Sequence, residues 1–329
     1  MKKPFFHGAK IQKAIPAWYK RVNILISKEE FLNIYHISED LFESAQMSWE
    51  ELTAIYRDFC DNKYQGYQDI LDAFIRDYLK DTARIKVHSI RYRVKDAEHL
   101  LAKIIRKKQN NHKKYRDLDK TNYEKFITDL IGIRCLVLFK EDWKSFHNYI
   151  LSQFENNVRC YVKDSIRDFD EDENHFYIAE KPKAHIRSGD AREIYDEVLP
   201  PDCVLDGKIY RSVHYILKYK GVYLEIQVRT LFEEGWGEVD HAIVYPHFQD
   251  DQLLKKYTEL LNRLSGLADE MGSFFCYLKE LQENSSQPQA PGQDSAEGSG
   301  ETRSQWSVRS QNPPVLATPG DCLKSVLDE

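Results

Sequence analysis

The apolar positions predict helices in the first part of the chain. Through about residue 80 they recur at helical spacing, in one stripe that begins at Leu52 and another that begins at Tyr67. Ser48 and Glu51 have the spacing of a capping box ahead of the first stripe, so we expect a helix to begin there. Both stripes are typical of helix faces that pack on a core.

The central part of the chain carries strand patterns instead. Loose alternation over 85–93 predicts an extended segment, after which Asp96 is placed to cap a helix. The apolar run 131–139 is the strongest candidate for a buried strand. A hairpin follows, with strands at 213–219 and 222–230 around a tight Lys220-Gly221 turn. Further helices are expected at 143–154, at about 232–239, and along an apolar stripe from Leu253 to Met271.

These patterns divide the chain into four parts. We expect a helical N-terminal extension over 1–83, a central domain over 84–247, a helix over 248–283 and a disordered tail over 284–329, where Ser, Gln, Pro and Gly abound. The stretch 158–208 resists assignment, and its acidic run at 168–173 favours a solvated loop. The expected fold class is α+β, a mixed β-sheet flanked by helices with helical N- and C-terminal extensions.

Composition and charge exclude several classes of protein. The 329 residues are 42% hydrophobic and carry 47 basic against 53 acidic side chains, a net charge of -6 that does not favour general nucleic-acid binding. No apolar run is long enough to cross a membrane, and none near the start resembles a signal peptide, so a cytoplasmic location is expected. The six cysteines are scattered without metal-binding spacing, which indicates reduced thiols.

One acidic residue lies on a predicted strand and another just before a second one. In the strand 225–230, Glu225, Gln227 and Arg229 share one face, which an ordinary half-buried sheet would also explain. Asp129 precedes the apolar strand and Arg134 lies inside it, and a charge in a buried strand needs a partner or a ligand. One interpretation is an ion pair between Asp129 and Arg134, or between Glu225 and a nearby arginine. If the strands are neighbours, the two carboxylates instead meet on one face, as a magnesium-triphosphate site requires.

Basic and aromatic residues accompany these carboxylates. Arg91, Arg93 and Lys95 precede the helix that Asp96 caps, and Lys103 and Arg106 share a face of that helix. A solvated basic face is the default explanation for them, and a phosphate cradle competes with it. Tyr210 and His214 could each be ordinary core residues, but together they offer a stacking face and a hydrogen-bonding group. The fingerprints of P-loop, dinucleotide-binding and common hydrolase enzymes are absent from the sequence.

Taken in order, these blocks resemble the synthetase domain of the RelA/SpoT alarmone family. The resemblance covers roughly residues 84 to 247 and rests on the following separated blocks: Arg93-Val94-Lys95, Lys103 with Arg106, Asp129 to Arg134, Tyr210 to His214, Glu225 to Thr230, and Trp236 with His241. It implies a nucleotidyltransferase-like fold and the transfer of pyrophosphate from ATP to the 3′-hydroxyl of GDP or GTP. The products would be (p)ppGpp, the alarmone of the stringent response, and AMP.

The resemblance also implies a role for each matched residue. Arg93 and Arg134 would clasp the adenine of ATP, and Lys95, Lys103 and Arg106 would hold its phosphates. Asp129 and Glu225 would bind Mg²⁺, with Glu225 also helping to deprotonate the attacking hydroxyl. Of the acceptor-binding residues, Tyr210 would stack on guanine, His214 would lie near the phosphates, and Gln227 and Arg229 would complete the polar face.

The chain departs from the family pattern at the acceptor side. Ile209 stands where the family usually has glycine, and the segment between Phe154 and Tyr210 is long, so Lys181, Lys183 and Lys208 are only candidate phosphate ligands there. No His-Asp dipeptide occurs, so the hydrolase half of the bifunctional enzymes is missing and a synthetase-only protein is expected.

Two other functions stay open: a toxin-type member that modifies the 3′ end of tRNA, and a binding protein without turnover. The helical extensions could form a homo-oligomer interface or cover the site.

Overall fold

A mixed β-sheet of eight strands forms the centre of the molecule. The computed structural model describes residues 11–13, 26–110, 112–156, 176–244 and 251–285. The strands are β1 (Ile11–Lys13), β2 (Ser89–Val94), β3 (Ile131–Val137), β4 (Glu155–Asn156), β5 (Tyr177–Arg187), β6 (Val204–Lys208), β7 (Ser212–Tyr219) and β8 (Val222–Thr230). They are ordered β1-β2-β3-β8-β7-β5-β4, with β6 paired to β5. β3 and β8 run parallel, whereas β2 and β7 run antiparallel to them.

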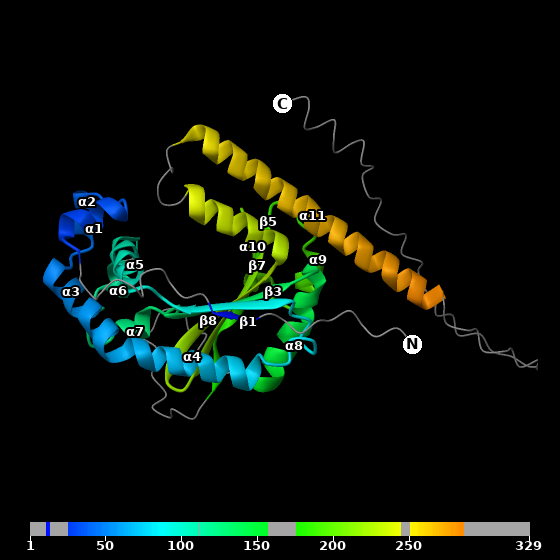
Figure 1. Cartoon of the computed structure of the whole chain (residues 1–329), viewed down its shortest axis with the longest axis horizontal. Helices are drawn as coiled ribbons and strands as arrows, with labels where there is room; N and C mark the ends of the chain where they lie inside the picture. The colour runs from blue at the N-terminus through cyan, green and yellow to red at the C-terminus, as the bar shows by residue number, and fades with distance from the viewer. Residues whose placement is uncertain (1–10, 14–25, 111, 157–175, 245–250, 286–329) are drawn as a thin grey trace, which may run out of the picture. The chain divides into compact units, whose positions relative to one another are not determined.

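Helices lie on both sides of this sheet (Figure 1). They are α1 (Lys28–Ile34), α2 (Glu39–Ser44), α3 (Trp49–Asp58), α4 (Tyr64–Tyr78), α5 (Ala97–Asn110), α6 (His112–Tyr115), α7 (Tyr123–Phe126), α8 (Trp143–Gln153), α9 (Glu193–Asp196), α10 (Leu231–Val239) and α11 (Gln252–Ser285). In the view of Figure 1, α4 lies below the strands while α10 and α11 lie above them. The α+β fold class, with its mixed sheet and helical extensions, is therefore confirmed.

Local sequence signals fix where several of these elements begin. The Ser48 hydroxyl accepts a hydrogen bond from the Glu51 amide at 3.1 Å, and the Glu51 carboxylate accepts one from the Ser48 amide at 2.7 Å, so the predicted capping box is present. The Asp96 carboxylate accepts bonds from the amides of Glu98 and His99 at the start of α5. The hairpin turns at Lys220-Gly221, where both residues have positive φ.

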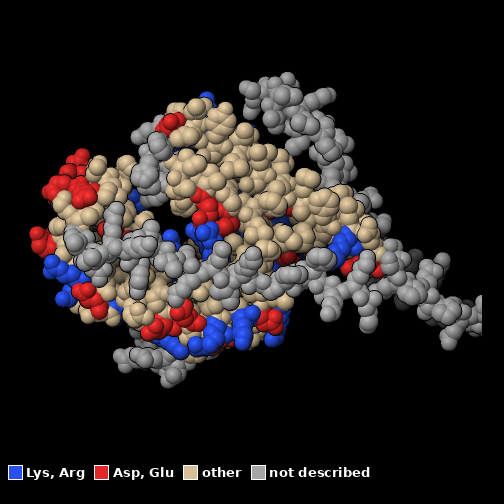
Figure 2. All heavy atoms as spheres, in the orientation of Figure 1, with Lys and Arg blue, Asp and Glu red and all other residues tan. Residues whose placement is uncertain are grey.

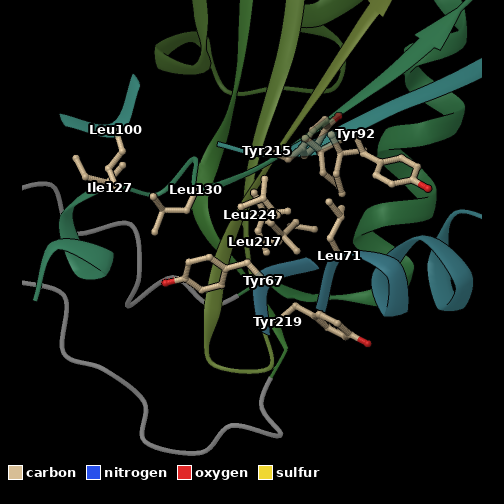
Figure 3. Close-up of a cluster of buried hydrophobic side chains, with 14 of the residues drawn as sticks. Tyr67, Leu71, Tyr92, Leu100, Ile127, Leu130, Tyr215, Leu217, Tyr219 and Leu224 are labelled. Carbon is tan, nitrogen blue, oxygen red and sulfur yellow. The ribbon is translucent and has the colours of Figure 1, made fainter. Parts of the chain in front are cut away.

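Helix α4 contributes to the core on one face of the sheet. Figure 3 shows Tyr67 and Leu71 of α4 near Leu217, Tyr219 and Leu224 of the hairpin, and all five are nearly inaccessible to solvent. Phe74, also on α4, packs edge-on against Tyr219 at 5.3 Å between ring centroids. The second predicted stripe therefore faces the core, as expected.

Several sequence predictions concern other parts of the chain. The acidic run at 168–173 and nearly all of the predicted tail lie outside the described residues. Among the helices that the structure describes, none combines the length and apolar character needed to cross a bilayer.

Candidate nucleotide site

One face of the sheet carries the predicted polar residues. Along β8, Ile226 and Val228 are buried in the core, whereas Glu225, Gln227 and Arg229 alternate with them and keep partial access to solvent. Strand pairing extends this face on both sides, because Gln227 lies opposite Arg134 of β3 and opposite His214 of β7. The predicted alternation of β8 is therefore confirmed.

The two predicted carboxylates come from neighbouring strands. β3 and β8 are paired in parallel, with Gly132 opposite Glu225, and Asp129 lies just before β3 at the same end. The Asp129 charge acts on the pKa of Glu225, in the raising direction, which reflects their proximity. The parallel pairing thus brings together two acids that are far apart in sequence.

Asp129 is held by lysines. Its Oδ2 lies 3.0 Å from Lys95 Nζ and 2.5 Å from Lys103 Nζ, and the interpretation as an ion pair with Arg134 is therefore wrong. Burial favours a raised pKa for Asp129, but the two ammonium groups outweigh it and lower the pKa, so the carboxylate is ionised at neutral pH. Its other oxygen, Oδ1, is buried without a hydrogen-bond partner and is available to a ligand.

A basic cavity adjoins this cluster. It has a volume of about 550 Å³ and is lined by Lys95, His99, Lys103, Arg106, Lys107, Asn110, Lys114 and Tyr115, a set with five cations and no acid. Burial, and then the nearby Lys103, lowers the pKa of Lys107, which shows that the cations act on one another. The cavity therefore presents concentrated positive charge suited to a polyanion.

Arginines on β2 and β3 continue the site. Burial, and then the charge of Arg134, lowers the pKa of Arg93, so these two guanidinium groups lie close together. Arg134 donates to Glu234 at 3.0 Å and to Glu238 at 2.6 Å, which fixes it under α10. The glutamates are four residues apart and so share one face of α10, a spacing that holds the planar guanidinium. Neither predicted interpretation of Arg134 included these partners.

A group of rings lies on the other side of Glu225. Tyr210 stacks on His185 with centroids 5.4 Å apart and an interplanar angle of 16°, and His185 lies 4.5 Å from His214. His185 comes from β5, and the sequence analysis missed it. Burial, followed by the charge of His214, lowers the pKa of His185 to about 4, so its ring is neutral at physiological pH. His185 Nδ1 and His214 Nε2 are buried without hydrogen-bond partners and could serve a bound molecule.

A chain of side-chain contacts fixes Glu225. Its Oε1 lies 3.4 Å from His214 Nδ1, and its Oε2 accepts a hydrogen bond from Gln227 Nε2 at 2.7 Å. Gln227 in turn accepts a bond from Arg229, whose guanidinium lies 6.0 Å from the centroid of the Tyr210 ring. Burial acts to raise the pKa of Glu225, but the bond and charge of His214 lead the opposing effects and the pKa is lowered. An ionised, oriented carboxylate results, and it faces His214 and Gln227 rather than an arginine.

The candidate lysines of the acceptor side differ in their surroundings. Lys181 pairs with Asp202 at 2.9 Å on the surface, and Lys183 lies 3.4 Å from Glu180. The charges of Lys208 and Lys183 both contribute to the low pKa of His185, which places them near the ring group. Ile209, which replaces the expected glycine, is 69% exposed.

The remaining residues of the family pattern lie on or beside α10. Trp236 donates from its indole nitrogen to the carbonyl of Thr258 at 3.0 Å and so ties α10 to α11. Burial, and next the charge of Arg134, lowers the pKa of His241. His241 therefore borders the arginine side of the site, whereas Trp236 fastens α10 to α11.

The donor set determines which metal the site could hold. In the described part of the chain no group of three or more His, Cys, Asp or Glu side chains forms a metal cage. Two carboxylates, one with a buried unpaired oxygen, fit an ion such as Mg²⁺, which is commonly bound by one or two carboxylates together with substrate phosphates. The residues thus fit a metal that arrives with a nucleotide.

Comparisons with known proteins give one matching family model and several similar solved structures. No curated protein sequence matches the chain. Similar solved structures include a GTP pyrophosphokinase family protein from Streptococcus pneumoniae (21% identity over 72% of this chain and 98% of that one, TM-score 0.44). They also include small alarmone synthetase 2 from Bacillus subtilis (20% identity, 67% and 98%, TM-score 0.43) and small alarmone synthetase 1 from the same organism bound to its product pppGpp (17% identity, 73% and 98%, TM-score 0.37). Residues 203–250 match the family model described as the region found in RelA and SpoT proteins, and this match confirms the family resemblance predicted from the sequence.

Proposed function

We propose that this protein transfers pyrophosphate from ATP to the 3′-hydroxyl of GDP or GTP. The observation that carries the proposal is the pair Asp129 and Glu225, which lies between a cavity lined by five cations and a group of three aromatic rings. Such a site offers one region for a polyanion and another for a base, with carboxylates between them. Phosphoryl-type transfer needs this kind of positioning and charge stabilisation more than it needs covalent chemistry.

On this proposal the basic cavity binds the donor. Lys95, Lys103 and Arg106 face the cavity and would neutralise the ATP phosphates. Lys95 and Lys103 both bond to Asp129, and on binding ATP they would exchange that partner for phosphate oxygens. Arg93 and Arg134 would then stack on the adenine, since a guanidinium plane is suited to a ring face.

The acceptor would bind on the opposite side of Glu225. Tyr210 would stack on the guanine, and His214, Gln227 and Arg229 would surround the sugar and phosphates. His185, which stacks on one face of the Tyr210 ring, would hold that ring in place. The ionised Glu225 would accept the proton of the 3′-hydroxyl as it attacks the β-phosphorus of ATP. AMP would leave as the other product.

Mg²⁺ is the proposed cofactor. Asp129, through its unpaired Oδ1, and Glu225 would hold it, and the ion would offset the charge that develops on the phosphate oxygens. Asp129 Oδ2 already bears two lysines, so Oδ1 is the oxygen of this carboxylate that would serve the ion. We expect a cytoplasmic enzyme, since its nucleotide substrates are found there.

A single experiment with labelled substrate tests this function. The purified chain is incubated with Mg²⁺ and ATP labelled in its β-phosphate, and with GDP, GTP or deacylated tRNA as acceptor. Label in a guanosine product together with equimolar AMP is the expected result. Label on tRNA would instead indicate the toxin-type reaction, and nucleotide binding without AMP release would indicate a binding protein.

A further inference from the structure

The long helix α11 has an unusual distribution of polar and apolar residues. The face that packs against the body is polar: Ser265 and Asp269 are buried, and Asn262 is bonded there. Asp269 accepts from Arg211 at 2.8 Å, and Asn262 Oδ1 accepts from Arg187 at 3.0 Å. A helix at a protein surface normally does the opposite and buries its apolar stripe.

The opposite face of α11 is apolar and exposed. Nine large apolar residues follow one another from Leu253 to Leu281 in steps of four and three, and each is between 37% and 64% exposed. We call these nine residues the outer stripe: Leu253, Tyr257, Leu260, Leu264, Leu267, Met271, Phe274, Leu278 and Leu281. Figure 2 shows the surface over α11 as a broad area with few charged side chains. Among the described residues, none covers the outer stripe.

The spacing of the outer stripe specifies its partner. Alternating steps of four and three residues over four heptads are the pattern of a coiled-coil seam, in which knobs of one helix enter holes of another helix with the same repeat. The other long helices that the structure describes already bury their apolar faces in the core. A second copy of this chain presents an identical stripe, and contact between like surfaces closes as a two-fold dimer.

The exposed apolar area of the outer stripe is large enough for a stable protein–protein interface. If a large apolar side chain offers roughly 200 Å² when fully exposed, nine half-exposed ones leave about 900 Å² of apolar surface. Single chains rarely expose apolar patches of more than a few hundred Å², whereas each partner of a stable interface buries about 800 Å². We propose that two copies of this protein associate through the outer stripes of their α11 helices, as an inter-subunit coiled coil.

The anchoring of α11 supports this geometry. Arg211 binds Asp190, Asp269 and Glu270 together, and Lys140 also binds Glu270 at 2.6 Å. The pair between the buried Arg211 and Asp269, together with the pairs to the half-exposed Glu270, holds the polar face of the helix against the body. The outer stripe is therefore presented on a fixed helix, which lowers the entropy lost on association.

Light scattering coupled to size-exclusion chromatography tests the proposal on the full chain. We expect a mass twice the 38.8 kDa of one chain at micromolar concentration. The double substitution Leu264→Glu and Leu267→Glu, at the middle of the outer stripe, should raise the dissociation constant at least about a hundredfold and give a monomer. Lys279→Glu adds the same acidic side chain to the same helix but off the stripe, and it should leave the dimer intact.

A milder variant separates loss of association from loss of folding. Leu264→Ala with Leu267→Ala keeps the helix uncharged and should still raise the dissociation constant by at least about tenfold, with an unchanged far-ultraviolet circular dichroism spectrum. A wild-type chain that is monomeric at these concentrations, or glutamate and alanine variants with the wild-type mass, would overturn the proposal. The result does not depend on the enzymatic function proposed above.

Discussion

Replacement of Glu225 by glutamine is the most direct test of the proposed chemistry. Glutamine preserves the size and planar end of the side chain. In the wild-type chain Gln227 Nε2 donates to Glu225 Oε2 at 2.7 Å, and the amide oxygen of a glutamine can accept the same bond while its nitrogen faces His214 Nδ1. The substitution therefore removes the charge and the basicity while leaving the fold. We expect the thermal unfolding midpoint to change by only a few degrees.

The expected effect on turnover follows from the role of the carboxylate. A positioned general base contributes on the order of 10² to 10⁴ in rate, which corresponds to about 3 to 5.5 kcal/mol in the activation free energy. Glu225→Gln should lower kcat by that factor at saturating nucleotide. Because the pKa of Glu225 lies below its ordinary value, activity that depends on this carboxylate should be fully present at neutral pH and fall only in the acid range below about pH 4.5.

The assay is AMP release under saturating ATP and acceptor, measured across pH. Glu197→Gln is the matched control, because Glu197 is an exposed carboxylate that pairs with Lys144 away from the site. A Glu225→Gln enzyme that retains about a third of the wild-type kcat would refute the assignment of Glu225 as base. So would a Glu197→Gln enzyme whose kcat falls by the factor expected for Glu225→Gln.

Two further substitutions test acceptor binding and acid stability. Tyr210→Ala should raise the KM of the guanine nucleotide by roughly 5- to 150-fold, since stacking of a base on an aromatic ring contributes about 1–3 kcal/mol, while Tyr210→Phe should change it little. His147 is buried, and burial lowers its pKa to about 4, so the unfolded chain takes up the proton first and folding stability falls as pH drops from about 6.5 toward 4. Chemical denaturation should show that the loss of stability between pH 7.5 and pH 5 is smaller by about 2 kcal/mol in His147→Gln than in the wild-type chain, the remainder including the contribution of His185, whose pKa is also lowered to about 4.

Each of these predictions has a control. A Tyr210→Ala enzyme whose KM for ATP rises in place of the KM for the acceptor would place the ring on the donor side instead. For the acid stability, His88→Gln replaces an exposed histidine and is the matched control. If the free energy of unfolding falls equally with pH in His147→Gln and in the wild-type chain, His147 is not the source of the acid sensitivity.

The sequence predicts the centre of the fold well. The Lys220-Gly221 turn and the alternation on either side of it define the hairpin to within a residue, since a tight turn sets the register of its strands. The apolar run 131–139 correctly predicts an internal strand, although the strand ends two residues earlier and spans Ile131–Val137. Asp129 and Glu225 lie near each other because β3 and β8 are neighbouring strands, and this pairing is the condition that the sequence alone leaves open.

The partners of the charged residues could not be predicted in the same way. Asp129 binds two lysines from before and within α5, and Arg134 binds two glutamates of α10, about a hundred positions away. Such pairs depend on how helices pack over the sheet, which no local pattern records. The nearest opposite charge in sequence was therefore the wrong partner.

His185 was missed for a related reason. Its strand, β5, contains Pro182 and changes register twice against β7, so the alternation that would mark a strand is broken. The helix α11 shows a different limit: its apolar spacing predicts a helix, but only the structure shows that the stripe faces away from the body.

The position of Arg106 has a consequence for how the donor cavity could respond to events elsewhere. Arg106 lines the cavity, and its guanidinium donates at 2.9 Å to the main-chain carbonyl of Tyr35, the residue that ends α1. A carbonyl is the same whatever side chain is present, so point mutations along α1 preserve the bond, whereas displacement of the helix breaks it. If the cavity binds ATP as proposed, a molecule that displaces α1 would change the affinity for ATP from a distance, without entering the cavity.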